Sequence, residues 1–263
     1  MRRSDVTVLS ISAALAAVVV ALVVSSFVID RSEDSATDRT AASTSSLLVV
    51  TWGPSLCAVE ESNPGCRSGH VQNLGSTLIV HGLWPQPRTE QFCGVPEAVV
   101  ERARDLDSTD MPTVDLPAQL STSLQSMMSD SSVMAPHEWF THGTCSGVAP
   151  DVYFGDLVSL SKQVGDLLNP VFRDAEHSKL SLGAVRDRFD TEFGGGAGNR
   201  VGLSCRDVDG QGVVVYEVHV SLPPIAQFRS EPGAGASPGP VALGDLLAEG
   251  PSTFAGCRRG LVP

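Results

Sequence analysis

The chain has 263 residues, and its 18 Lys and Arg against 30 Asp and Glu give a formal net charge of −12 at pH 7. This acidic balance excludes a protein that coats nucleic acid or anionic lipid through a broadly basic surface, because neutralising phosphates requires many cations. Hydrophobic residues make up 42% of the chain, which excludes disorder throughout. A local site that handles a phosphate stays compatible with the charge.

The N-terminal segment predicts export. Arg2 and Arg3 precede an uncharged, largely apolar run over residues 6–28, which as a helix would be about 34 Å long and could cross a hydrocarbon core. We predict that residues 1–29 form a signal anchor or a signal peptide, with the chain after Asp30 outside the cytoplasm. A buried core helix is disfavoured, because uninterrupted apolar runs of this length are rare in soluble cores.

The remainder divides into a linker and one domain. Residues 30–46 are polar, of low complexity and poor in large apolar side chains, so we predict a flexible linker. No second linker of this kind follows, and we assign residues 47–263 to a single domain.

That domain mixes strand and helix patterns. Four runs rich in β-branched residues predict strands: 47–52, 77–80, 201–205 and 213–220. Four segments predict helices: 95–106, 115–128, 151–168 and 181–189. We expect Asp151 to cap the third helix and Pro170 to end it, and the segment 222–240, rich in Pro and Gly, to be a loop. Because the strands are spread among helices without βαβ alternation, the predicted fold class is α+β.

The first chemical motif is "TLIVHGLWPQ", residues 77–86. We expect His81 at the exit of a strand, with Gly82 and Pro85 turning the chain. Such a turn would expose His81 and place Trp84 on the rim of a pocket. The alternative is a hydrogen-bonded turn histidine, with Trp84 filling the core.

The second motif is "HEWFTHGTC", which begins at His137. A zinc site needs two histidines four residues apart, but His137 and His142 are five apart, about 140° round a helix. Glu138 and His142 are four apart, so a carboxylate and an imidazole share one face, as acid–base chemistry requires. We expect Gly143 to end the helix and Cys145 to tether it. The alternative is an ordinary surface Glu–His pair.

Together the two segments resemble the signatures "IHGLWP" and "HEWxKHGTC" of the ribonuclease T2 family, in the family's order. They stand here at residues 80–85 and 137–145, and looser similarity at 151–168, at 201–220 and in the terminal Gly–Cys extends over most of 47–263. The resemblance implies a central, mainly antiparallel sheet flanked by helices. On this basis the chain is identified as a bacterial member of the family, membrane-anchored or secreted.

The resemblance also implies an endoribonuclease. Such an enzyme cleaves single-stranded RNA by attack of the ribose 2′-OH on the adjacent phosphorus, through a 2′,3′-cyclic phosphate. It implies that His142 is the base, His81 the acid and His137 a phosphate-binding group. Glu138 would orient or polarise, and Trp84 would stack on a base. Which histidine is base and which is acid stays open from the sequence.

The resemblance and the N-terminal segment together set the expected partners. No metal or other cofactor is required. The expected partners are the RNA substrate and, if the N-terminal segment is uncleaved, the membrane. We expect a monomer in an extracytoplasmic compartment.

The cysteines point to disulfides. All six follow residue 56, and an even number in an exported chain favours disulfides over free thiols. Six cysteines allow fifteen pairings, and the family resemblance selects Cys57–Cys66, Cys93–Cys145 and Cys205–Cys257. We interpret the other histidines as ordinary polar or strand residues: His70, His177 and His219.

Two positions depart from the family pattern. Thr141 stands where the family usually has Lys, so a fixed positive charge near the phosphoryl oxygens is missing, which His137 or Arg88 would have to replace. We therefore predict a working but slower enzyme, whose turnover Thr141→Lys raises. Gln86 stands where some members have an acidic residue that helps choose the base, so base preference stays open.

Two other functions are compatible with the sequence. One is a catalytically weakened relative that binds RNA or another polymer at the cell envelope. The intact His81, Glu138 and His142 count against it, and Thr141 counts for it. The other is a zinc hydrolase, which the spacing within the second motif disfavours and a chelator would test.

Overall fold

The computed structural model describes residues 43–104, 110–229 and 240–263, and the six strands within them form a single sheet. The sheet runs in the order β2-β1-β5-β6-β3, and β4 pairs with β5 beside this path. Neighbouring strands are antiparallel except β5 and β6, which meet at one pair, Val214 and Leu261. The strands are β1 Ser45–Trp52, β2 Leu78–Gln86, β3 Lys179–Ser181, β4 Val201–Val208, β5 Gly212–Leu222 and β6 Arg259–Leu261.

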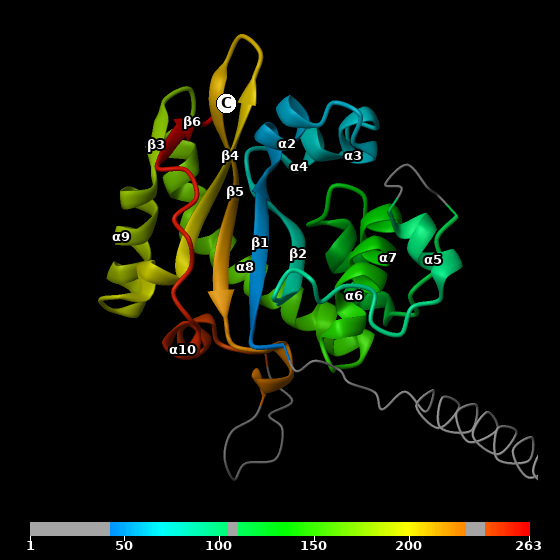
Figure 1. Ribbon diagram of the computed structural model, residues 1–263. Helices are drawn as coiled ribbons and strands as arrows, with labels where there is room; N and C mark the ends of the chain where they lie inside the picture. Colours follow the sequence, from blue (N-terminus) through cyan, green and yellow to red (C-terminus); the bar gives the residue numbers. More distant parts are fainter. Residues whose placement is uncertain (1–42, 105–109, 230–239) are drawn as a thin grey trace, which may run out of the picture. The chain divides into compact units, whose positions relative to one another are not determined.

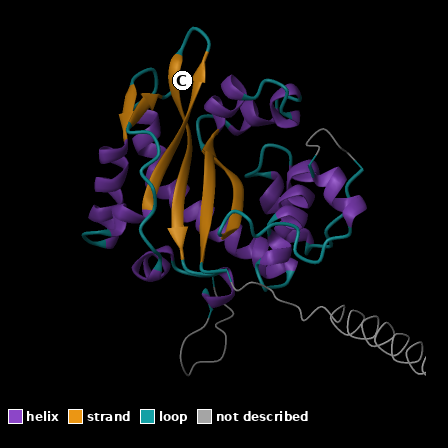
Figure 2. Ribbon diagram, viewed as in Figure 1, coloured by secondary structure: helices purple, strands orange, loops and turns teal. Residues whose placement is uncertain are grey.

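Helices flank this sheet, as Figures 1 and 2 show. They are α2 Gly53–Val59, α3 Pro64–Arg67, α4 His70–Leu74, α5 Glu97–Ala103, α6 Ala118–Gln125, α7 Ser131–Thr141, α8 Pro150–Asp174, α9 Leu182–Phe193 and α10 Leu243–Glu249. The mainly antiparallel sheet with flanking helices confirms the predicted α+β class.

The predicted helices at 95–106, 115–128 and 181–189 exist as α5, α6 and α9 with different ends. α9 begins directly after Ser181, whose Oγ accepts a hydrogen bond from the N–H of Ala184 at 3.1 Å. This side-chain cap fixes the start of the helix. The loop predicted at 222–240 contains one 3₁₀ turn, Ile225–Gln227, in its described part.

The predicted ends of the longest helix are wrong. α8 continues through Pro170 to Asp174, and Ala149 rather than Asp151 is its N-cap. An internal proline costs about 3 kcal/mol, but Phe172, two residues further on, is fully buried in the core. Burial of such a side chain contributes about 1.5–3 kcal/mol, so tertiary packing offsets the cost and carries the helix past Pro170.

The two faces of the sheet have different roles. On β1, alternate side chains enter the core that contains the buried face of α8: Leu48, Val50 and Trp52. The side chains between them point the other way, because strand side chains alternate, and they pair with a second row on β5. These pairs are Leu47 with Ser221, Val49 with His219 and Thr51 with Glu217. We call this side of the sheet, opposite α8, the open face.

The strand that carries the first motif is longer than predicted. β2 runs without a turn through His81, Gly82 and Trp84 to Gln86, so the turn expected at Gly82 and Pro85 is wrong. β2 is an edge strand, where the missing N–H of a proline leaves no ladder bond unmade.

A β-bulge places His81. Val49 pairs with Gly82 and Val50 with Val80, so His81 is the extra residue in β2. Because of this extra residue, Val80 and Leu83 both enter the core although they are three residues apart. His81 thereby comes to the side of the sheet that carries Thr51, to which it is hydrogen-bonded.

A second bulge lies between β4 and β5. Ser204 pairs with Glu217 and Cys205 with Val215, so Tyr216 is the extra residue in β5. Tyr216 leaves the main core for a small cluster with Leu56 of α2 and Ile79 of β2. Both bulges therefore shape the open face at the same end of β1.

The start of the domain also differs from the prediction. β1 begins at Ser45, and Ser46 is fully buried with its Oγ donating to the carbonyl oxygen of Pro223 at 2.8 Å. The predicted linker 30–46 was therefore two residues too long at its end. The predicted segment 1–29 and the linker up to residue 42 lie outside the described residues. Within the described ranges, no helix has the length and apolar content needed to span a bilayer.

Candidate active site

His81 is held from both sides by carboxylates. Its Nδ1 lies 2.9 Å from Oε1 of Glu217 on β5 and 3.3 Å from Oγ1 of Thr51 on the neighbouring strand β1. Its Nε2 lies 3.9 Å from Oε1 of Glu138 on α7. The ring is 24% exposed, whereas both carboxylates are buried. His81 therefore has one nitrogen fixed in the protein and the other directed toward Glu138.

Glu138 joins the two motifs. Its Oε2 accepts a hydrogen bond from Nε1 of Trp84 at 2.9 Å, and its side chain is buried. A Cβ on Gly82 would overlap both Oε2 of Glu138 and Nε1 of Trp84. Gly82 is therefore needed for close approach of α7 to β2, and not for the turn that the sequence suggested.

His142 also packs against Trp84. Its ring stacks on the indole with centroids 5.2 Å apart and planes at 29°, while the ring of His81 meets the indole edge-on at 5.2 Å and 86°. The structure thus brings together the predicted site residues His81, Trp84, Glu138 and His142.

α7 is anchored so that this arrangement is rigid. Trp139 packs edge-on against Tyr153 at 5.7 Å, and the hydroxyl of Tyr153 donates to the carbonyl oxygen of Leu83 at 2.8 Å. α7 ends at Thr141 and the N–H of His142 donates to the carbonyl of Glu138 at 3.0 Å, so the predicted end at Gly143 is close to the observed one.

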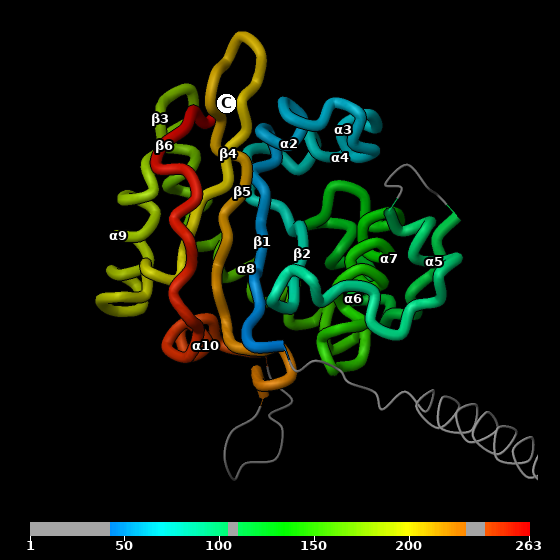
Figure 3. Tube along the Cα trace, in the orientation of Figure 1, coloured from blue at the N-terminus to red at the C-terminus, as the bar shows by residue number. Residues whose placement is uncertain are grey.

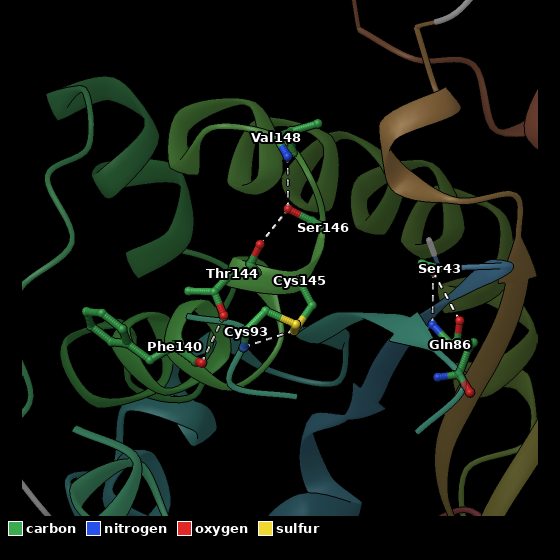
Figure 4. The surroundings of a disulfide bond; sticks show 9 residues. Ser43, Gln86, Cys93, Phe140, Thr144, Cys145, Ser146 and Val148 are labelled. Carbon is green, nitrogen blue, oxygen red and sulfur yellow. Dashed lines mark hydrogen bonds between the residues drawn. A yellow bond between two sulfur atoms is a disulfide. The ribbon is translucent and has the colours of Figure 1, made fainter. Parts of the chain in front are cut away.

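A disulfide continues this anchoring, as Figure 4 shows. Cys145, in the 3₁₀ turn after His142, is bonded to Cys93. The neighbouring Thr144 donates its hydroxyl to the carbonyl of Phe140 at 3.2 Å. The segment that carries His142 is therefore tied both to α7 and to the chain after β2.

His137 lines a different pocket from His142. Its Nδ1 is 2.8 Å from the carbonyl oxygen of Ala103 at the end of α5, which acts as acceptor. The ring lines a pocket of about 450 Å³ together with His81 and Arg104. His137 therefore reaches the site from the side of His81.

A second pocket lies on the side of His142. It has a volume of about 230 Å³ and is lined by Trp84, Pro85, Gln86, Arg88, Gln91 and His142. Two pockets thus adjoin the pair of histidines, and each contains an arginine: Arg104 in the first and Arg88 in the second.

The pKa values of the two histidines move in opposite directions. Burial alone would lower the pKa of His81, but the hydrogen bond to Glu217 and the charges of Glu138, Glu217 and Glu60 outweigh it and raise the pKa to about 9. Burial lowers the pKa of His142 to about 4, and the charge of Glu138 only partly opposes this. At neutral pH His81 is therefore protonated and His142 is neutral.

The sequence reading missed Glu217, and it interpreted His219 as an ordinary strand residue. The two oxygens of Glu217 lie 2.9 Å from Nδ1 of His81 and 2.9 Å from Nε2 of His219. Burial would raise the pKa of Glu217, but its hydrogen bonds to His219 and His81 and their charges hold it well below the usual range. The sequence does contain a pattern that indicates this pair. Glu217 and His219 are the two polar positions in the apolar run 213–220, and they share one strand face.

The comparisons with known proteins show the family of the chain. The sequence model of the ribonuclease T2 family matches residues 44–230. The chain belongs to the ribonuclease T2 family. The resemblance carried by the two motifs is thereby confirmed, and the chain is an endoribonuclease of the ribonuclease T2 type.

Individual relatives are distant in sequence. Ribonuclease I of Escherichia coli (strain K12) is 25% identical over 203 residues, which are 67% of this chain and 74% of that protein. RNase NT in complex with 5′-AMP is 19% identical with a TM-score of 0.51, and the match covers 73% of this chain and 95% of that chain. A point mutant of ribonuclease MC1 is 21% identical with a TM-score of 0.50, covering 68% of this chain and 89% of that chain. The two solved structures show that the chain shares their fold.

This ribonuclease T2 chain differs from the family signature at Thr141. The Thr141 side chain is only 5% exposed, and its Oγ1 has no hydrogen-bond partner within the described residues. Arg88, in contrast, lines the pocket of His142, and its charge helps to lower the pKa of that histidine. Arg88 is therefore the cation that the structure places on the side of His142.

The three disulfides pair as the family resemblance implies. Cys57 joins Cys66 between α2 and α3, Cys93 joins Cys145, and Cys205 of β4 joins Cys257 before β6. Disulfides persist in oxidising compartments, so these bonds and the family agree with an extracytoplasmic ribonuclease.

Proposed function

We propose that the chain cleaves single-stranded RNA by metal-independent transphosphorylation, with His142 as the base and His81 as the acid. The observation that carries this proposal is that both histidine rings lie against the indole of Trp84, in surroundings that shift their pKa values in opposite directions. A neutral imidazole can accept a proton and an imidazolium can donate one, so both roles are filled at neutral pH. This choice of base and acid was open from the sequence.

In the first step His142 takes the proton of the ribose 2′-OH as its oxygen attacks the adjacent phosphorus. The new O2′–P bond forms, the P–O5′ bond breaks, and Nε2 of His81 gives its proton to the leaving O5′. The products are a 2′,3′-cyclic phosphate and a free 5′-OH. In the second step the roles reverse: His81 takes a proton from water, which attacks the cyclic phosphate, and His142 protonates the leaving O2′.

The negative charge on the phosphoryl oxygens needs donors or cations nearby. His137 and Arg104 line the pocket beside His81, and Arg88 lines the pocket beside His142. We assign phosphate binding to His137, as the family resemblance implies, and give Arg88 the part of the cation that Thr141 does not supply. Glu138 polarises His81 and orients Trp84 through the bonds described above.

The base of one nucleotide fits the pocket beside Trp84. One face of the indole is occupied by His142, so a base in this pocket stacks against the remaining indole surface and meets Gln86, Arg88 and Gln91. Gln86 offers an amide that can donate and accept, which a carboxylate cannot. The base preference is therefore expected to differ from that of relatives with an acid at this position.

We also propose that the chain is exported from the cytoplasm. The charged start and apolar run of residues 1–29 support a signal anchor or signal peptide, and the three disulfides fit an extracytoplasmic site of action. If the segment is not cleaved, the ribonuclease is held at the membrane. We further propose that it acts as a monomer.

The test is cleavage of RNA by the oxidised full-length chain in EDTA. We expect 2′,3′-cyclic ends, lost in His81→Ala and in His142→Ala. Loss of wild-type activity on chelation would favour a metal-dependent hydrolase instead. Binding of RNA without any cleavage between pH 4 and 8 would favour the alternative of a catalytically weakened, polymer-binding relative, for which the buried Thr141 is the motivating observation.

A further inference from the structure

A third cavity extends the open face away from the two histidine pockets. It is a groove of about 610 Å³ that crosses the sheet from Gln86 at the end of β2 and the following Arg88, over β1 and β5, to Arg206 on β4. Its far wall is the segment 251–257, which in Figure 3 runs beside β4. Three strand spacings of about 4.8 Å give on the order of 14 Å across the strands alone, so the groove is longer than one nucleoside.

The groove is continuous with the candidate active site. Gln86 and Arg88 line both this groove and the pocket that contains Trp84 and His142. His219, which shares Glu217 with His81, lines it from the middle of the sheet. A polymer that leaves the pocket beside Trp84 can therefore enter the groove without leaving the protein surface.

The chemistry of the lining suits a polyanion. Arg88 and Arg206 line the groove with several hydroxyl side chains, and no Asp or Glu is among its lining residues. A groove lined without Asp or Glu is unusual in a chain with 30 acidic residues. The guanidinium of Arg206 is held over the ring of Tyr216 at 5.1 Å and hydrogen-bonded to Oγ of Ser204 at 3.1 Å. A positioned cation in an acid-free groove fits phosphate.

Phe254 on the far wall is 95% exposed, the most exposed large hydrophobic residue in the part of the chain that the structure describes. Its backbone is nevertheless fixed on both sides. The N–H of Thr253 donates to the carbonyl of Asn199 at 3.0 Å, and the carbonyl of Ala255 accepts from the N–H of Leu203 at 3.0 Å. The disulfide at Cys257 ties the same segment to β4. The aromatic ring is thus presented to solvent by a rigid support.

We propose that this groove binds the nucleotides of single-stranded RNA beyond the two that flank the scissile bond. Phe254 stacks on a base, and Arg88 and Arg206 contact phosphates. Stacking on an exposed aromatic side chain combined with a cationic track is how proteins hold single strands without reading their sequence. The inference rests on the proposed function for the identity of the polymer, and it makes the enzyme prefer long RNA over dinucleotides.

The test is binding of a 2′-O-methyl RNA octanucleotide, which has no free 2′-OH and is not cleaved, measured by fluorescence anisotropy with the full-length oxidised chain. We expect Phe254→Ala to weaken binding of the octanucleotide about 5-fold or more. Arg206→Ala should reduce the slope of log Kd against log salt by about 0.7. Neither change should alter kcat/KM for an unmodified dinucleotide.

Two matched variants serve as controls. Val213→Ala removes the other exposed large hydrophobic side chain of the described ranges, and Arg188→Ala removes a half-buried α9 arginine that pairs with Glu192. Both variants should bind the octanucleotide as the wild type does. If Phe254→Ala and Arg206→Ala bind the octanucleotide as tightly as the controls, the proposal that this groove binds RNA is wrong. Absence of cleavage of long, unmodified RNA would instead overturn the proposed function, and binding of the octanucleotide would still test the groove.

Discussion

Oε1 of Glu217 lies 2.9 Å from Nδ1 of His81. A hydrogen bond at Nδ1 fixes the orientation of the imidazole and leaves Nε2 directed toward Glu138. The carboxylate also favours the protonated ring, so one contact both positions the acid and keeps it charged. Glu217 touches no reacting atom in the proposed mechanism and is a positioning residue.

Glu217→Gln should therefore change the pH dependence of the reaction more than its maximum. Without this carboxylate the pKa of His81 falls, so we expect the alkaline limb of the profile of kcat/KM to move down by about one pH unit or more. Near pH 5, where His81 is still protonated, activity should stay within about 10-fold of the wild type. Glu60→Gln is the control, because Glu60 acts on His81 through charge alone. A uniform loss at all pH values would mean that Glu217 is only structural.

The raised pKa of His81 also predicts how stability depends on pH. Its folded pKa of about 9 lies above the ordinary value of 6.5. The contribution of protonated His81 to the free energy of unfolding is therefore complete below pH 6.5 and is lost as the pH rises through 9. This shift corresponds to about 3 kcal/mol, so His81→Gln should lower the free energy of unfolding more at pH 6 than at pH 9.5 by about that amount. Urea unfolding at both pH values measures it, and an equal effect at both would contradict the raised pKa.

Arg88 is predicted to supply the positive charge that Thr141 does not. Arg88→Ala should reduce single-turnover cleavage of a dinucleotide by about 10-fold or more, since it removes a cation beside the phosphoryl oxygens. Thr141→Lys should raise wild-type turnover, and it should recover part of the activity in the Arg88→Ala background. If Thr141→Lys is no faster in either background, the missing lysine does not limit the rate.

Gly82 is predicted to be indispensable for close approach of the two motifs. Gly82→Ala forces Glu138 and Trp84 apart, and a displacement of about 1 Å at such a site can cost about 100-fold in rate. Gly155→Ala on α8 is the matched control, because a Cβ there meets no atom within 4 Å. Steady-state kinetics with a circular dichroism check of folding measures both. Full activity of Gly82→Ala would show that the contact between Glu138 and Trp84 is dispensable.

Sequence reasoning located His81, Glu138 and His142 because each lies in a short motif whose spacing carries the chemistry. It could not locate the bulge at His81, because the extra residue is defined only by the pairing of β2 with β1. It ended α8 at Pro170 because a local rule cannot weigh the burial of Phe172.

Glu217 was missed for a related reason. Its partner His81 lies far away in sequence on another strand of the same sheet, and only the topology brings the two together. A local pattern of polar and apolar residues shows which face of a strand a side chain occupies. It does not show what lies across that face.

The most direct test of the central claim is an NMR titration of the histidine Cε1–H resonances, assigned through His81→Gln and His142→Gln. We predict that His81 titrates near pH 9 and His142 near pH 4, so that the pair holds one proton, on His81, across the range between these values. Titration of both near the ordinary value of 6.5, or His142 above His81, would contradict the assignment of base and acid.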